Sequence, residues 1–381
     1  MTSAKGDSVL ALMTDSNLSA GAAVTPTGGA AILAPISAFS NGVPGNAMVL
    51  IPLDPSGKPI EKQIVDGPVA ITMEEVWKLL GFNGPAVQVQ DDEGRPIAIG
   101  LEDLLGGLDK HWTENPSDGD RARLYAQELI KYGRNEKAET VLAKLVANGG
   151  TGDDWMALGV TQLAQEKWDK AEGTLRGAQN LLKDNPYPSL HLARAAKGKG
   201  DTLAERTMIE RAIEIAPNAV DAWAYLYEST KAHSSDAEAL AAVESLANKP
   251  ANEKTAAPYI ALQGFFAADE TTRDTAINYA KKGVERTPSD PLALLVLSAL
   301  YGQSGNLGEI ITLLAPHEAL MQRDVRLAHN YFEALWQGKD LPKVTALLNK
   351  LATSPTKEVK QFAIERSRAI SQMMQNQQTA S

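Results

Sequence analysis

Histidines and clustered carboxylates are the side chains of this sequence that could carry acid–base or metal chemistry. None of the histidines stands in the HExxH spacing that places two imidazoles on one helix face for a metal. They are isolated from one another along the chain, at His111, His191, His233, His317 and His329. We interpret them as histidines of the surface or of a repeat groove, and we expect no metal site. The absence of cysteine also excludes a thiolate nucleophile and a cysteine metal site.

Acidic side chains stand together in "TMEEVW" (72–77) and "DDEG" (91–94). A carboxylate pair needs a cleft before it can act as general acid and base, and these pairs fall on an expected helix start and an expected hairpin turn. Helix capping and solubility explain them more simply. The sequence also lacks a P-loop, a nucleophile elbow and a dinucleotide fingerprint. We therefore predict a protein that is not an enzyme and has no cofactor; the alternative is catalysis at an unrecognised site in the N-terminal region.

The N-terminal third of the chain and the remainder differ in sequence pattern, and they also differ in net charge. The 381 residues carry a net charge of −10, of which residues 1–118, with 6 Lys and Arg against 15 Asp and Glu, hold −9. An acidic surface repels phosphate backbones, and no basic stripe interleaved with aromatic residues is present, so nucleic acid is not an expected partner. No long run of large apolar residues predicts direct membrane insertion. With no signal peptide recognised, we expect a cytoplasmic, bacterial protein.

An internal repeat of 34 residues organises the remainder. Trp155 and Trp223 are two periods apart, and the same shift aligns Leu158, Leu192 and Leu226. Small residues and a proline recur in the same frame. In "RAIEIAPNAVDAWAYLY" (211–227), an apolar helical face stops at the proline, which cannot continue a helix, and a second apolar face begins after it.

The repeated unit resembles the tetratricopeptide repeat family over about residues 119–376. Its marks are a small residue in the first helix, two more in the second and a closing proline, as in "WMALGVTQLAQEKWDKAEGTLRGAQ" (155–179) and "AINYAKKGVERTP" (276–288). The resemblance implies a mainly α fold, a right-handed superhelical solenoid of about seven helix-turn-helix repeats plus a capping helix at about 357–376. The expected units are 119–151, 152–185, 186–219, 220–256, 257–290, 291–324 and 325–358.

Packing explains the order of residue types within a unit. Gly159, Ala171 and Ala178 are expected to let the two helices of a hairpin approach closely, whereas Trp155 and Leu175 fill the space between hairpins. One hairpin alone leaves an apolar face exposed, so stability comes from stacking neighbours.

The N-terminal third matches no family that we recognise. Residues 1–45 have the Ala/Gly/Ser/Thr/Pro-rich composition of a flexible arm. Residues 46–115 predict a small acidic α+β domain with two β-hairpins, one in 46–65 around Asp54–Gly57 and one in 86–99 around Asp92–Gly94. A polar tail, 377–381, ends the chain.

The resemblance also implies a concave groove lined by the first helix of each hairpin. The exposed positions are Arg123, Gln127, Lys131, Met156, Val160, Leu190, Arg194, Lys197, Glu228, Lys231, Phe265, His329, Glu333 and Trp336. A groove that is basic and partly apolar at its start suits an acidic or C-terminal peptide segment. The alternative is that Arg123, Lys131 and Lys197 are ordinary solvated charges. The family's chaperone-binding carboxylate clamp is not expected, because its asparagines are missing here.

Two functional hypotheses follow. In the first, the protein is a scaffold or adaptor that binds a partner protein or peptide in the groove while the acidic N-terminal domain contacts a second partner. In the second, it is a structural or assembly subunit of a larger complex, anchored through its N-terminal arm by strand pairing. The acidic region could instead cover the basic groove of its own chain.

Overall fold

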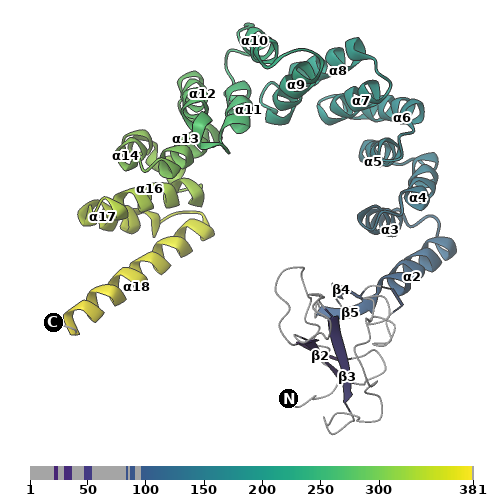
Figure 1. Cartoon of the computed structure of the whole chain (residues 1–381), viewed down its shortest axis with the longest axis horizontal. Coiled ribbons are helices and arrows are strands. Elements are labelled where there is room, and N and C mark those ends of the chain that lie inside the picture. The colour runs from purple at the N-terminus through teal and green to yellow at the C-terminus, as the bar shows by residue number, and fades with distance from the viewer. Residues whose placement is uncertain are drawn as a thin grey trace, which may run out of the picture. The chain divides into compact units, whose positions relative to one another are not determined.

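The structure is a computed structural model that describes residues 21–24, 30–36, 47–53, 83–84, 86–90 and 96–379. The chain forms two compact units, Met1–Gly150 and Thr151–Ser381 (Figure 1).

The first unit contains two antiparallel sheets. β1 (Gly21–Val24), β2 (Ala30–Ile36) and β3 (Ala47–Leu53) form one, and β4 (Ala86–Gln90) pairs with β5 (Pro96–Gly100) in the other. β4 and β5 occupy the stretch where a hairpin was expected, with Ala86 opposite Gly100. β3 pairs with β2, and the partner strand expected after Gly57 lies outside the described residues, as do "TMEEVW" and "DDEG".

Two strands lie in the segment for which composition predicted an arm. β1 and β2 are short and rich in alanine, so they show no alternation of polar and apolar residues that would have marked them as strands.

Three helices complete the first unit. They are α2 (Leu101–Glu114), α3 (Gly119–Lys131) and α4 (Asn135–Ala147). Tyr125 of α3 is fully buried, and its hydroxyl donates to Asp109 Oδ1 at 2.9 Å. Because Asp109 lies on α2, this bond joins α2 to the α3–α4 hairpin.

The second unit is a row of helical hairpins that follow one another in chain order, each packed on the next (Figure 1). Its helices are α5 (Gly152–Leu163), α6 (Trp168–Leu181), α7 (Tyr187–Gly198), α8 (Thr202–Ile215), α9 (Val220–His233), α10 (Asp236–Ala247), α11 (Ala257–Phe266), α12 (Arg273–Arg286), α13 (Pro291–Gln303), α14 (Leu307–Leu314), α15 (Glu318–Met321), α16 (Val325–Gln337), α17 (Leu341–Leu351) and α18 (Lys357–Thr379).

Local chemistry fixes where these helices begin. Thr151 and Asp154 form a reciprocal capping box at α5: the Asp154 N–H donates to Thr151 Oγ1 at 3.3 Å, and the Thr151 N–H donates to Asp154 Oδ2 at 2.7 Å. Asp201 and Asp290 cap α8 and α13 through their carboxylates alone, which accept from the backbone N–H of Ala204 and from those of Leu292 and Ala293.

Small residues allow the close contact within hairpins that the repeat pattern predicts. A Cβ atom added at Gly159 would lie 2.5 Å from Leu175 Cγ, and Leu175 is fully buried. Ala171 and Ala178 of α6 are also fully buried. Any larger side chain at Gly159 would push α5 away from α6.

Trp223 lies between hairpins. Its side chain is 0% exposed, and its Nε1–H donates to the carbonyl of Pro217 at 2.8 Å. The core around it combines side chains of α8, α9 and α10, including Ile209 and Val243. The proline that ends one hairpin is therefore hydrogen-bonded to the tryptophan that fills the next interface.

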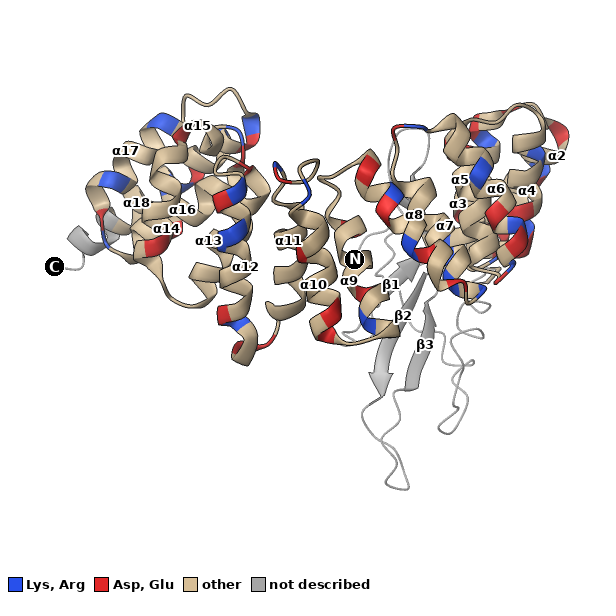
Figure 2. Cartoon of the chain, turned by 90° about the horizontal axis from the view of Figure 1, so that it is seen from above, with Lys and Arg blue, Asp and Glu red and all other residues tan. Residues whose placement is uncertain are grey.

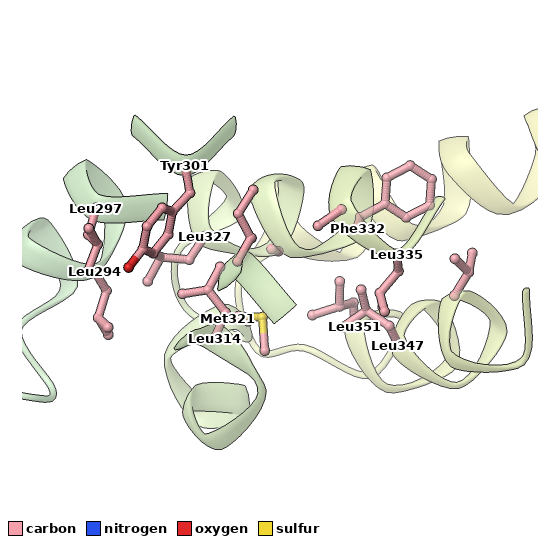
Figure 3. Close-up of a cluster of buried hydrophobic side chains, with 14 of the residues drawn as sticks. Leu294, Leu297, Tyr301, Leu314, Met321, Leu327, Phe332, Leu335, Leu347 and Leu351 are labelled. Carbon is pink, nitrogen blue, oxygen red and sulfur yellow. The ribbon is translucent and has the colours of Figure 1, made fainter. Parts of the chain in front are cut away.

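The largest core lies at the C-terminal end. Figure 3 shows leucine and aromatic side chains of α13, α16 and α17 meeting Leu314 and Met321. The second helix of this sixth hairpin is broken into α14, a 3-10 turn (Ala315–His317) and α15, because Pro316 cannot continue α14. α18 then covers the end of the row with Val359 and Ala363, both fully buried.

Candidate binding groove

A cavity of about 510 Å³ opens between α5, the start of α6 and α7. Its lining is mostly apolar, with two cations, and consists of Val160, Leu163, Ala164, Trp168, Arg194, Lys197 and Gly198. Arg194, Lys197 and Val160 were predicted to face the groove, and the structure brings these three to one place. A concave, mostly apolar site with a few polar groups is the usual form of a ligand pocket.

Gly198 allows the indole of Trp168 to lie against α7. A Cβ atom at Gly198 would be 2.5 Å from Trp168 Cδ2 and 2.6 Å from Cε2 and Cε3. The ring is therefore held at the first turn of α6 by direct contact with the α7 backbone. An indole fixed in this way presents a rigid apolar surface to a ligand.

Arg194 and Lys197 are exposed, and among the residues that the structure describes neither forms an ion pair. Arg194 Nη1 lies 3.4 Å from His191 Nδ1, and Lys197 Nζ lies 6.0 Å from the centre of the Tyr225 ring. Nearby Lys199 differs, since its Nζ is 2.8 Å from Asp169 Oδ1 and 2.9 Å from Glu172 Oε2. These two carboxylates raise the pKa of Lys199. The two cations of the cavity therefore keep their charge available for a ligand.

His191 adds no charge at neutral pH. Burial lowers its pKa to about 4, and the nearby positive charge of Arg194 lowers it further in the same direction. A neutral imidazole can accept a hydrogen bond from the Arg194 guanidinium, which orients that side chain. Sequence spacing did not indicate this role.

Helices α8 and α9 contain a group of buried or partly buried polar side chains. Glu205 of α8 is 0% exposed, and its Oε2 is 3.1 Å from Nε2 of His233. The buried hydroxyl of Tyr225 has no hydrogen-bond partner among the described residues. Burial and then the neighbouring Glu205 carboxylate raise the pKa of Tyr225.

The predicted groove residues of α9 and α11 do not line the α5–α7 cavity. Lys231 Nζ is 2.8 Å from Asp236 Oδ1, and this carboxylate raises the pKa of Lys231. Phe265 is 36% exposed, and its ring centre lies 4.3 Å from that of Tyr227. Glu228 is exposed on α9.

At the C-terminal end, Trp336 is partly buried and packs against the core. Its ring stacks on Phe332 at 6.2 Å, and it packs against the largest buried cluster. His329 is exposed, with Nδ1 at 3.9 Å from Glu333 Oε1 and its ring edge-on to Phe362. The structure does not bring these residues to the α5–α7 cavity.

The first unit contains Arg123, Gln127 and Lys131, all on α3. Arg123 Nη1 is 2.8 Å from Asp120 Oδ1, and Lys131 Nζ is 3.4 Å from Glu128 Oε2. Gln127 is exposed. The two cations thus already have carboxylate neighbours on their own helix.

Other kinds of site have no support in the described part of the chain. Figure 2 shows acidic and basic residues interspersed along the helices of the second unit rather than gathered by sign. No group of histidines and carboxylates among the described residues could hold a metal ion. Nor does any helix in that part of the chain have the length and apolar character needed to cross a membrane.

No family model and no curated protein matches the sequence. Solved structures of other proteins do match parts of the chain. MamA from Desulfovibrio magneticus matches 38% of this chain and 83% of its own at 14% identity, with a TM-score of 0.34. Yeast Tom70 matches 72% of this chain and 59% of its own at 12% identity and a TM-score of 0.37. YrrB, described as a TPR protein with an unusual peptide-binding site, matches 50% and 97% at 17% identity and a TM-score of 0.31.

The paired helices and the buried small residues at matching points of each pair define the class of fold. The chain carries a mainly α solenoid of helical hairpins with a capping helix, as the repeat predicts. The expected resemblance is confirmed.

Proposed function

We propose that this protein is a non-enzymatic scaffold or adaptor that binds an extended segment of a partner protein at the α5–α7 cavity. The observation that carries the proposal is an apolar cavity with two cations at its edge, Arg194 and Lys197, which form no ion pair with any described residue. The preferred ligand has an acidic side chain or a C-terminal carboxylate beside an apolar side chain. The carboxylate accepts hydrogen bonds from Arg194, and the apolar group packs on Trp168.

The proposal also includes a second partner and a cellular location. The acidic region before residue 119 contacts a second partner, and binding takes place in the cytoplasm. Support for the first is the concentration of negative charge in residues 1–118, which favours a basic protein surface.

An array of 12-residue peptides of random sequence tests the proposal. The full chain should retain peptides enriched in Asp, Glu or a free C-terminal carboxylate together with Leu, Ile or Phe. A variant with Arg194→Gln and Lys197→Gln should bind the best of them at least about tenfold more weakly, since loss of charged hydrogen bonds costs about 1.5–3 kcal/mol.

The matched control is Arg211→Gln. Arg211 is also an exposed arginine of the second unit, but its Nη1 is 3.2 Å from Glu214 Oε2. This variant should bind like the wild type. Retention of mainly basic peptides, or equal affinity of the double variant and the wild type, would contradict the proposal.

A further inference from the structure

The broken second helix of the sixth hairpin borders a second cavity. The second helices of the other hairpins of this unit, α6, α8, α10, α12 and α17, run for 11 to 14 residues. In contrast, α14 ends after 8 residues, and the chain continues through the turn at Pro316 into α15. A cavity of about 230 Å³ is lined by this turn together with α15, α16 and α17.

The walls of this cavity are held in place. Met321 of α15 is 1% exposed and belongs to the core shown in Figure 3. On α17, Lys350 Nζ lies 2.6 Å from Glu318 Oε1 and 2.9 Å from Glu318 Oε2. The Ser354 hydroxyl, which follows α17, donates to the carbonyl of Gln322 at 2.6 Å. Because α15 is tied to α17 at two points, little ordering is required when a ligand enters the cavity.

The charged side chains that line the cavity already have partners. Glu318 pairs with Lys350, and Lys343 Nζ lies 2.8 Å from Asp340 Oδ2. The hydroxyl of Tyr331, which also lines the cavity, forms no hydrogen bond with any described residue. Burial raises the pKa of Tyr331, so the hydroxyl keeps its proton and can donate it to a ligand. Unlike the α5–α7 cavity, this one combines paired cations with a neutral donor.

The size and chemistry of the lining define the group that fits. A cavity of about 150 Å³ can hold benzene, and pockets for larger ligands begin at about 300 Å³. Met321, Ala346 and Leu347 give the cavity an apolar side that suits one aromatic ring. A phenol hydroxyl can accept a hydrogen bond from Tyr331 and donate one to the carboxylate of Glu318. A charged group would have to compete with the ion pairs that the lysines already form.

We propose that this cavity is a second binding site and that it takes a 4-alkylphenol group, either as a small phenol or as the side chain of a tyrosine in a partner protein. The proposal does not depend on peptide binding at the α5–α7 cavity, so either proposal can fail without the other.

The first test titrates the full chain with p-cresol and follows the methionine methyl groups by NMR. The Met321 resonance, assigned with Met321→Leu, should shift to saturation with a Kd in the millimolar range, as expected of a ligand of this size. Met208 packs against the same buried cluster as Leu163 of the α5–α7 cavity, so it reports binding there. No saturable shift of Met321, or a larger shift of Met208, would overturn the proposal.

Two analogues of p-cresol test the role of the hydroxyl group. 4-Methylanisole keeps the ring but cannot donate a hydrogen bond, and p-toluate replaces the hydroxyl by a carboxylate. Both should bind at least about threefold more weakly than p-cresol, because each loses a hydrogen bond that the lining offers. Tighter binding of p-toluate would show that the lysines recognise the ligand, which contradicts the proposal.

Variants of the lining test the location of the site. Ala346 is exposed on α17, so Ala346→Leu can fill the cavity without entering the core, and it should weaken p-cresol binding at least about tenfold. Thr345→Leu is the matched control, because Thr345 is also exposed but does not line the cavity. It should bind p-cresol like the wild type. Wild-type affinity in Ala346→Leu would place the ligand elsewhere and overturn the proposal.

The paired charges make a separate prediction. Glu318→Gln releases Lys350 from its ion pair, so this variant should bind p-toluate more tightly than p-cresol, the reverse of the wild type. A variant that keeps the wild-type preference would contradict the account of the lining.

The peptide N-acetyl-Gly-Tyr-Gly-amide distinguishes the two sources of the phenol group. If it shifts Met321 and binds at least as tightly as p-cresol, the site takes a tyrosine of a partner protein. If p-cresol alone binds, the site takes a small phenol. If neither shifts Met321, the site is not a phenol site and the proposal is overturned.

Discussion

At the scale of single residues, we expect Trp223 to contribute to stability and Trp168 to contribute to the proposed binding. Trp223 is fully buried and hydrogen-bonded to Pro217, whereas Trp168 lines the cavity and is half-buried. Trp223→Ala should lower the free energy of unfolding by about 3–5 kcal/mol. Trp168→Ala should cost less stability but reduce affinity for the acidic peptide. Urea unfolding and fluorescence anisotropy measure the two effects; the same pattern in both variants would contradict this division.

His191 makes stability depend on pH in a defined window. Its pKa is about 4 in the folded chain against an ordinary value of 6.5, so the unfolded chain binds the proton more tightly. The contribution of the neutral side chain is complete above pH 6.5 and is lost as the pH falls towards 4, by at most about 3 kcal/mol.

The measurement is the free energy of unfolding from pH 7 to 4 for the wild type and for His191→Gln. The variant should lose less stability than the wild type over this range, because it has no imidazole to protonate. Parallel curves would show that His191 is not responsible.

The sequence alone could place Arg194 and Lys197 on one helical face, because residues three apart on a helix are neighbours. It could not show that Lys231 lies beside Asp236, since that contact depends on the short turn between α9 and α10. Nor could it show that Trp336 packs against the core or that the Tyr225 ring lies 6.0 Å from Lys197 Nζ. Such assignments depend on how neighbouring hairpins pack, which periodicity alone does not fix.

At the scale of elements, the approach of α5 to α6 depends on Gly159. Gly159→Ala should destabilise the chain by about 1–3 kcal/mol, because its Cβ would overlap the fully buried Leu175. Gly173→Ala, in α6 of the same hairpin, is the control. No atom lies within 4 Å of a Cβ added at Gly173, so this substitution should raise the free energy of unfolding by up to about 1 kcal/mol, because alanine has the higher helix propensity. Thermal unfolding of both variants measures the contrast, and a loss in Gly173→Ala equal to that in Gly159→Ala would contradict it.

Helices were more predictable than strands for a physical reason. Apolar and small residues recur at the same positions in successive units of about 34 residues. A helix boundary that is poorly marked in one unit can therefore be placed from the corresponding boundary in its neighbours. The short strands β1 and β2 are built from alanine and other apolar residues, and they carry neither alternation nor repeated spacing. The break of the sixth hairpin at Pro316 and its continuation as α15 were not predicted, because the repeat spacing gives only the bounds of the unit.

At the scale of the whole molecule, stacking of neighbours predicts local rather than uniform loss of stability. Val359 of α18 is fully buried on the last hairpin, whereas Met373 of the same helix is 53% exposed. Val359→Ala should increase hydrogen exchange in α16 and α17 first, with little change in α7 and α8. Met373→Ala should leave exchange unchanged. A uniform increase throughout the second unit would contradict a stacked row of separable hairpins.

The central claim, that Arg194 and Lys197 select the charge of a bound segment, is tested most directly by reversing that charge. The peptide array should be repeated with the full chain carrying Arg194→Glu and Lys197→Glu. We predict that the variant loses the acidic peptides and retains basic ones that keep the same apolar side chain, because the cavity around Trp168 is unaltered. Retention of the same acidic peptides by the variant would contradict the claim.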